Sequence, residues 1–258
     1  MSKKKDRTGE ENINKFGSKM IIKEYRGAND LDIYFPEYNW ISEHNAYNNF
    51  KKGLVKCPYE PNVFERGYIG DGIYKSRING KLIKSYSEWH DMFDRCYNSE
   101  FHKRHPSYKD CDVANIWFNY QRFGDWFSKN YYEVPEETMH LDKDILYKGN
   151  KIYSPEKCIF VPNKINTLFI KCDRSRGDLP IGVYYDKDRN KYTAGYKINK
   201  IRKFIGRYDN PEDAFYVYKL HKEKLIKETI DSYKGIIPEP HYSRLREAMY
   251  NYKVEIDD

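Results

Sequence analysis

Residues 140–170 constrain the fold more than any other stretch of this 258-residue chain. They open with apolar and polar residues in alternation over 140–146, which is the pattern of a strand with one buried face. A loop rich in Gly, Asn, Ser and Pro follows, and then a short apolar run, 159–161, that ends at a proline. Residues 163–170 have the spacing of a helix with one apolar side. The sequence therefore predicts a ββα unit, in which a helix packs across two short strands.

The stretch resembles the ββα unit of His-Me finger (HNH-type) endonucleases, which are common in phages. It is closest to a variant in which Leu-Asp-Arg-Ile-Asp is followed by Gly-Asn-Tyr-Ser-Pro-Glu-Asn-Cys. The matching residues are Leu141-Asp142-Lys143-Asp144-Ile145, Gly149-Asn150, Tyr153-Ser154-Pro155-Glu156 and Cys158. The resemblance implies a unit that approaches a DNA phosphodiester.

In active members of that family, a histidine of the first strand deprotonates a water, and a nearby side chain holds a divalent metal. The resemblance makes five residues catalytic candidates: His140, Asp142, Lys143, Asp144 and Asn150. Lys143 stands at the position of the base, but a lysine with an ordinary pKa of about 10.4 activates water poorly. It is better suited to gripping a phosphate. Strand alternation puts His140 on the face of Asp142 and Asp144, so it replaces the base only if the strand twists or bulges.

Mg²⁺ (or Mn²⁺) is the cofactor expected of an active unit, because carboxylates and water are the ligands that such hard cations prefer. The candidate ligands are Asp142 and Asp144, with Asn163 and Asn166 at the helix positions where the family places a metal-binding residue. Asn150 is expected to pin the loop. A salt bridge or a turn cap is the alternative use of the two aspartates. A degenerate unit would need no cofactor and would serve as a DNA-binding element or a scaffold.

Two helical patterns precede this stretch. Trp89, Met92, Phe93 and Cys96 fall at i, i+3, i+4 and i+7 of a helix that begins near 87, with Ser85 or Ser87 as its N-cap. A second helix is expected over 116–126. The aromatic residues of both are expected to form core. The region resembles the lead-in to the variant ββα unit, a Trp-x-x-Met-x-x-Arg-Cys-Tyr-Asn run followed by further Tyr, Cys, Trp and Phe residues.

The N-terminal part of the chain alternates short β-like runs with turns over 16–74, which predicts a small twisted sheet or barrel. Its basic residues are either DNA contacts or ordinary solvated charges: Lys23, Arg26, Lys51, Lys52 and Lys56. The Gly-rich segment 66–80 reads as a linker or hairpin. It lacks the helix and the Lys-Ser/Thr pair of a phosphate-binding loop.

The C-terminal part begins after a break at 173–180. Residues 182–233 resemble the APETALA2-type (ethylene-response-factor) DNA-binding domain, which has three short strands and one amphipathic helix. The matching positions are Gly182-Val183, Tyr192, Ala194, Gly206, Tyr208, Pro211-Glu212, Ala214 and Tyr218. Turns are expected at Asn190 and at 199–200, and Asn210 is expected to cap a helix that starts at Pro211. The helix residues expected to cover the sheet are Ala214, Phe215, Tyr218 and Leu225.

The other face of this sheet is the candidate DNA-binding surface. Between Lys187 and Arg207 there are eight basic residues and one acid, Asp188. A basic sheet with interleaved tyrosines suits the major groove. The candidate contacts are Lys187, Arg189, Lys191, Tyr192, Lys197, Arg202, Lys203 and Arg207. The alternative is a solvated edge, where lysines prevent aggregation.

Composition bears on partners and location. The net charge of +7 suits a polyanion such as double-stranded DNA, although many ordinary proteins share it. There is no apolar run long enough to span a bilayer and no signal-peptide pattern, so we expect no membrane partner. The five scattered cysteines (57, 96, 111, 158 and 172) indicate reduced thiols, and their spacing disfavours a zinc site. We therefore expect a cytoplasmic protein, in the host cell cytoplasm if a phage encodes it.

The sequence as a whole predicts an α+β fold of several modules. We expect a mobile tail over 1–12, a small β module over 13–76, helices with the ββα unit over 77–172, an APETALA2-like domain over 176–236 and a tail or short helix over 237–258.

The leading functional hypothesis is a DNA-binding protein of the phage homing-endonuclease type with a candidate metal-dependent nicking activity. One alternative is a catalytically degenerate phage DNA-binding regulator. The other is a phage protein that binds and blocks a host nucleic-acid machine; it predicts weak duplex affinity and a stable complex with a host protein.

Overall fold

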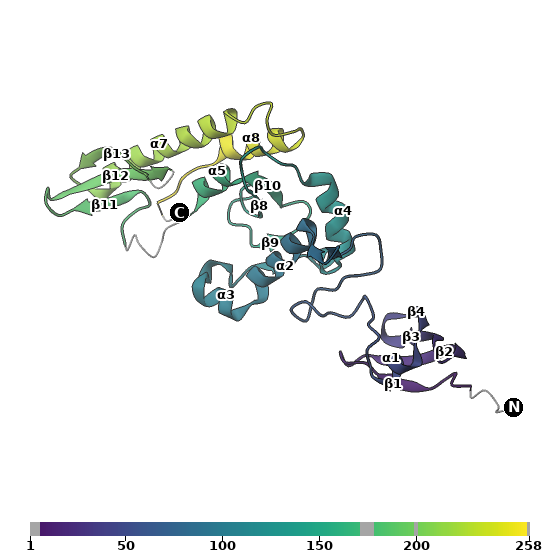
Figure 1. Cartoon of the computed structure of the whole chain (residues 1–258). Helices are drawn as coiled ribbons and strands as arrows, with labels where there is room; N and C mark the ends of the chain where they lie inside the picture. The colour runs from purple at the N-terminus through teal and green to yellow at the C-terminus, as the bar shows by residue number, and fades with distance from the viewer. Residues whose placement is uncertain (1–5, 171–177, 199–200, 257–258) are drawn as a thin grey trace. The chain divides into compact units, whose positions relative to one another are not determined.

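The computed structural model describes residues 6–170, 178–198 and 201–256, with the side chains of 197, 198, 201 and 202 left out (Figure 1). The chain divides into two compact units, Met1–Lys129 and Asn130–Asp258. Both contain helices and short antiparallel sheets, which confirms the α+β prediction. Residues 173–177 of the predicted break and the turn at 199–200 lie outside the described residues.

A four-stranded antiparallel sheet begins the first unit, in the order β1 (Glu11–Ile13), β2 (Lys19–Gly27), β3 (Asp30–Phe35) and β4 (Trp40–Asn45). Leu31, Ile33 and Phe35 alternate along β3 and are fully buried, so one face of the sheet carries the core. The short helix α1 (Tyr47–Lys51) packs on that core through Phe50. The predicted small β module is therefore an open sheet.

The described part of the expected N-terminal tail is held against this sheet. Gly9 donates its backbone N–H to the carbonyl of Ile22, and the Arg7 guanidinium lies 4.0 Å from the centre of the Tyr47 ring. The tail prediction is thus corrected for residues 6–12, because main-chain pairing begins before β1 does.

The end of the Gly-rich segment is a hairpin of β5 (Arg77–Ile78) and β6 (Lys81–Leu82). Asn79 and Gly80 have φ of 50° and 76°, which is the left-handed backbone of an Asn-Gly hairpin turn. The hairpin interpretation is confirmed for this part.

The helical region consists of α2 (Lys84–Tyr97), α3 (Ser99–Arg104), the 3-10 helices η2 (Pro106–Tyr108) and η3 (Asn115–Phe118), strand β7 (Asp112–Val113) and α4 (Tyr120–Asn130). The predicted serine caps are wrong. The Ser85 hydroxyl bonds the Tyr120 hydroxyl at 2.8 Å, and Ser87 donates to the carbonyl of Ile83. The helix expected over 116–126 is interrupted because the Asn119 side chain accepts the N–H of Gln121 and restarts the chain as α4.

The aromatic residues of this region are core, as predicted. Trp89, Trp117, Tyr120 and Phe123 are fully buried, and the Trp89 and Tyr120 rings lie 5.4 Å apart. The Trp89 indole donates to the carbonyl of Trp117 at 2.7 Å, which satisfies its polar atom inside the core. Cys57, Cys96, Cys111 and Cys158 are buried as well.

The second unit contains the ββα unit. Strands β8 (Met139–Asp142) and β10 (Ile159–Pro162) pair in antiparallel register, and a single α turn, α5 (Asn163–Asn166), continues as η4 (Thr167–Phe169). The short β9 (Ile152–Tyr153) lies in the loop between the strands. The predicted topology is correct, but the first strand ends at Asp142 instead of residue 146.

A three-stranded antiparallel sheet follows, of β11 (Val183–Asp186), β12 (Lys191–Ile198) and β13 (Ile201–Tyr208), as predicted. The long helix α7 (Pro211–Asp231) packs on one face of it (Figure 1). Asn190 turns the first hairpin with φ of 51°, and the Asn210 side chain caps α7 by accepting the N–H of Asp213 at 2.8 Å.

Ala214, Phe215 and Tyr218 of α7 cover the sheet, as predicted. Leu225 does not belong to that core cluster, because the 21-residue helix extends beyond the short strands. The last helix, α8 (His241–Asn251), confirms the expected short helix and packs against α7.

The segment after α8 returns to the sheet. Val254 is 3% exposed within the sheet–helix core, its N–H bonds the Glu223 carboxylate at 3.0 Å, and its carbonyl accepts from Lys219 at 2.7 Å. The core of the three-stranded module is thus completed by residues far along the chain. Among the described residues, no helix combines the length and apolarity that crossing a bilayer requires.

We predict that Gly182→Ala destabilises the second unit strongly. Gly182 has φ of 75°, and a Cβ there would lie 2.1 Å from the buried Tyr218 ring. Gly149 shares the conformation, with φ of 81°, but has no atom within 4 Å of a built Cβ. Gly149→Ala is expected to cost about 1 kcal/mol from backbone strain alone, and Gly182→Ala about 2 to 3 kcal/mol more from overpacking. Chemical denaturation of the full chain measures both; equal losses would contradict the packing argument.

Candidate nucleic-acid interface

Asp142 ends strand β8. One of its carboxylate oxygens, Oδ1, accepts the backbone N–H of Asp144 at 2.8 Å and that of Ile145 at 2.7 Å. This turn takes Asp144 out of the strand, which corrects the expectation that His140, Asp142 and Asp144 share one strand face. Asp142 therefore serves as a turn cap, the alternative use considered for it.

Lys143 is buried instead of facing solvent. Its side chain is 9% exposed, and the ammonium pairs with the Asp144 carboxylate at 3.1 Å. The same nitrogen lies 5.9 Å from the centre of the Tyr153 ring. Asp144 is thus one half of a salt bridge, and little of the Lys143 ammonium is accessible to a phosphate.

The helix of the ββα unit contributes one contact to the strand residues. The His140 imidazole Nε2 lies 3.1 Å from the Asn163 side-chain oxygen. Because an amide oxygen only accepts, this pairing makes Nε2 the protonated nitrogen. Asn166 is the last residue of α5, and among the described residues no hydrogen bond joins it to the two aspartates. The structure therefore joins His140 to Asn163, and Asp142 to the loop.

Asn150 pins the loop, as expected. Its amide nitrogen donates at 2.7 Å to the carbonyl of Lys143 and at 2.7 Å to that of Ile152. Asn150 thus ties the end of the β8 turn to the start of β9, and its role here is to hold backbone.

Burial, followed by the charge of Asp144, raises the pKa of the Asp142 carboxyl to about 6, against the two backbone N–H bonds and Lys143, which lower it. Oδ1 of Asp142 is bonded to two backbone N–H groups, and Oδ2 of Asp144 is paired with Lys143. The set of residues at this place fits a folded turn better than an open magnesium site, since a hard cation needs several free oxygens.

A different group of potential ligands lies in the first unit, and the sequence analysis missed it. The ligand atoms of Asp30, Asp32 and His44 lie within 4.8 Å of one another. Arg26 occupies these carboxylates, with contacts of 2.8 Å to Asp30 and 2.6 Å to Asp32. The Arg26 hydrogen bond, followed by that of His44, holds the pKa of Asp30 well below its usual range. Arg26, a candidate DNA contact, is therefore held in ion pairs with this cluster. The cluster forms because the pairing of β2, β3 and β4 brings residues of different strands together.

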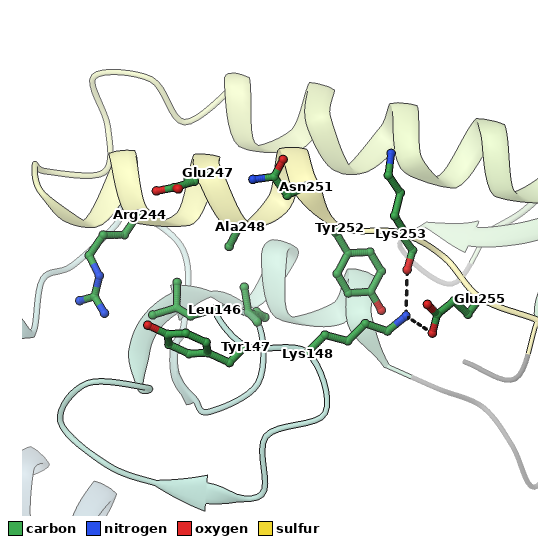
Figure 2. Close-up of a pocket in the computed structure, with 11 residues that line it drawn as sticks. Leu146, Tyr147, Lys148, Arg244, Glu247, Ala248, Asn251, Tyr252, Lys253 and Glu255 are labelled. Atoms are coloured by element: carbon green, nitrogen blue, oxygen red, sulfur yellow. Dashed lines mark hydrogen bonds and ion pairs between the residues drawn. The ribbon is translucent and has the colours of Figure 1, made fainter.

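A cleft of about 440 Å³ lies beside the ββα loop (Figure 2). Loop residues 145–148 form one side, and α8 with the segment that follows it forms the other. Lys148 closes one end, since its ammonium bonds the Lys253 carbonyl at 2.8 Å and the Glu255 carboxylate at 3.0 Å. The walls carry both charges, from Arg244 and Glu247. No sequence pattern indicated this cleft, because its two sides are distant in the chain.

Strand register sorts the C-terminal sheet into two faces. Val183, Ala194 and Gly206 align across the strands on the side covered by α7. Their neighbours Tyr184, Thr193 and Arg207 align on the opposite side, which we call the open face. Phe204 also lies on the open face, opposite Gly195, and is 54% exposed.

Tyr192 belongs to the covered face. It pairs with Tyr185 and Tyr208 in the register and packs against the core beneath α7. This corrects its placement among the candidate DNA contacts, because a one-residue step along a strand changes the face.

Acids outside the counted segment pair with three of its basic residues. Arg207 and Arg189 contact the Asp186 carboxylate at 3.3 and 3.4 Å, and Lys191 pairs with Asp209. Burial of Asp186 opposes ionisation, but the Arg207 hydrogen bond and the Arg189 charge hold its pKa below the ordinary value. Lys187 is exposed in the hairpin turn. Lys203 is exposed as well, but it pairs with Tyr196, which packs against the core beneath α7, so the register places Lys203 on the covered face and corrects its prediction as a contact of the open face. The side chains of Lys197 and Arg202 lie outside the described residues.

No protein-family model, curated protein or solved structure matches the chain. The choice between functions therefore rests on the geometry of the second unit.

We predict that Asp142→Asn stabilises the protein at pH 7 but not at pH 4. The folded-state pKa of Asp142 is about 6, above its ordinary value of 3.8, so the folded state favours the neutral carboxyl. The neutral Asp142 carboxyl contributes its full share of the folding stability below pH 4, and this share is lost as the pH rises through 6. An amide keeps the Oδ1 acceptor without the charge. Because Asp142 is partly exposed, we expect a gain of about 1 kcal/mol.

Thermal unfolding across this pH range measures the effect. Asp142→Ala is the control, since it removes the acceptor of two N–H groups and is expected to destabilise at every pH. If Asp142→Asn were as unstable as Asp142→Ala at pH 7, the charge itself would be required, and the reasoning would fail.

Proposed function

We propose that the protein binds double-stranded DNA through the open face of the sheet β11–β12–β13. One observation carries the proposal: α7 closes one face of this sheet, while the other presents the exposed Phe204 beside Arg207, with the exposed Lys187 in the turn after β11. An aromatic ring and guanidinium in contact, with a flanking lysine, are groups that base edges and phosphates accept together.

A small antiparallel sheet suits this partner, because the major groove of B-DNA, about 12 Å wide, admits a narrow β-ribbon. Lys187 in the hairpin turn is exposed, and it is the candidate phosphate contact in this arrangement. The net charge of +7 adds a long-range attraction to the polyanion.

In this proposal the ββα unit is a scaffold beside the DNA-binding sheet. Lys143 at the base position is buried against Asp144, and the Asp142 oxygen is used by the backbone. The protein would then act as a DNA-binding regulator that needs no metal. Buried free thiols suit action in a cytoplasm, which we propose as the location of the protein.

A second candidate is metal-dependent nicking by the ββα unit. The observation that favours it is the His140–Asn163 pair, which fixes the imidazole and leaves its other nitrogen as the candidate base. Bound Mg²⁺ or Mn²⁺ would stabilise charge on the scissile phosphate. A host protein as partner remains a third hypothesis, and it predicts weak duplex binding.

We predict that removing the lysine of the hairpin turn weakens duplex binding and its salt dependence. Each lost phosphate contact lowers the log–log salt slope by about 0.9, so Lys187→Ala should lower it by about 1. Fluorescence anisotropy with a labelled duplex over a salt series measures this. Lys81→Ala, in the first unit, makes the same charge change at an exposed position and is the control. Equal slopes for the two variants would refute the proposed surface.

We predict that supercoiled plasmid stays intact in Mg²⁺ or Mn²⁺, as it does with chelator. Nicking that needs the metal and disappears in His140→Ala or Asp142→Ala would establish the second candidate instead. The same samples in a gel shift report binding, so loss of cutting and loss of binding are separated.

A further inference from the structure

One acid lies on the open face of the sheet among the basic residues. Asp186 alternates with Tyr184 along β11, so its side chain emerges on that face, and it is 16% exposed. Its Oδ2 atom receives the Arg207 Nε at 3.3 Å and an Arg189 terminal nitrogen at 3.4 Å. A surface that only attracted phosphates would gain nothing from a half-buried negative charge.

Arg207 is held from two sides. Asp186 takes its Nε, and the guanidinium carbon lies 4.7 Å from the centre of the Phe204 ring. The carboxylate contact does not use the two terminal nitrogens, which carry four N–H donors in one plane. A planar pair of donors matches the O6 and N7 acceptors of guanine in the major groove.

The sheet residue beneath Arg207 is buried. Thr193 stands between Tyr184 and Arg207 in the register, is 1% exposed, and its hydroxyl finds no hydrogen-bond partner among the described residues. The sheet beneath the Arg207 side chain is therefore packed, while the guanidinium itself, on a side chain that is 41% exposed, stays accessible to a partner.

We propose that Asp186 is a specificity-determining residue that positions Arg207 to bind a guanine through the major groove. The inference rests on the proposed DNA binding and adds to it the base that the sheet recognises. Asp186 acts through Arg207 and is a positioning residue.

The same contacts disfavour binding that does not depend on the DNA sequence. The Asp186 carboxylate cancels part of the positive charge of Arg207 and Arg189 that attracts a phosphate, whereas an uncharged guanine edge needs only the terminal nitrogens of Arg207. Removing the Asp186 charge should therefore raise affinity for unselected duplex while weakening discrimination. A merely structural residue would lower binding to every duplex alike.

The test begins with selection of bound duplexes from a pool with a randomised centre, using the full chain. We expect the selected sites to share a guanine. Replacing that guanine by 7-deazaguanine, which lacks N7, should weaken binding by about tenfold, within the range of one bidentate contact.

Asp186→Asn should bind the guanine and 7-deazaguanine duplexes within about threefold of each other. It should also bind unselected duplex more tightly, with a salt slope steeper by about 1 to 2. Asp186→Glu is the conservative variant and should keep part of the discrimination. Arg207→Lys keeps the charge but loses the fork, so it should lose discrimination as well, and it makes the same test if Asp186→Asn does not fold.

The possible results distinguish failure of this inference from failure of the proposed function. Salt-dependent duplex binding without guanine selection overturns the inference and leaves the proposed function standing. A uniform loss of affinity in folded Asp186→Asn also overturns it, since Asp186 would then only support the sheet. No binding to any duplex refutes the proposed function, and the inference falls with it.

Discussion

Two main-chain hydrogen bonds to one carboxylate oxygen of Asp142 decide the geometry of the ββα unit. They end β8, turn Lys143 inward onto Asp144 and bring the loop to where Asn150 can hold it from both ends. In an open catalytic centre such an oxygen would be available to a metal or a water. Here it accepts two backbone N–H groups. The unit therefore has the predicted ββα topology, while the polar groups of Asp142, Lys143 and Asp144 bond mainly within the protein.

The sequence was sufficient for the topology. Apolar periodicity located the aromatic core around Trp89 and Trp117, and local chemistry located the Asn210 cap and the turn at Asn190. These signals act over a few residues, so a single sequence contains them. The end of β8 was misplaced because an alternating pattern continues past Asp142, while the side chain that stops the strand bonds backbone that the pattern does not show.

The candidate site was less predictable, because charge was counted along the chain and ion pairs form across strands. Asp186 and Asp209 lie just outside the basic segment, yet strand pairing brings them to Arg207 and Lys191. The Arg26 cluster was missed for the same reason, since Asp32 and His44 come together only when β3 and β4 pair. The face of Tyr192 likewise depends on register. Net charge thus overstates the cationic surface that a partner meets.

The return of Val254 to the core of the three-stranded module also defines what can be exchanged between proteins. A segment cut at the end of α7 would carry a sheet and a helix with a gap where Val254 packs, and with Lys219 and Glu223 deprived of the backbone groups they bond. Recombination that follows the apparent motif would deliver a defective module. A complete transfer would have to include the sheet and every residue through 254. The surface of the sheet can therefore be exchanged intact only as part of this longer segment.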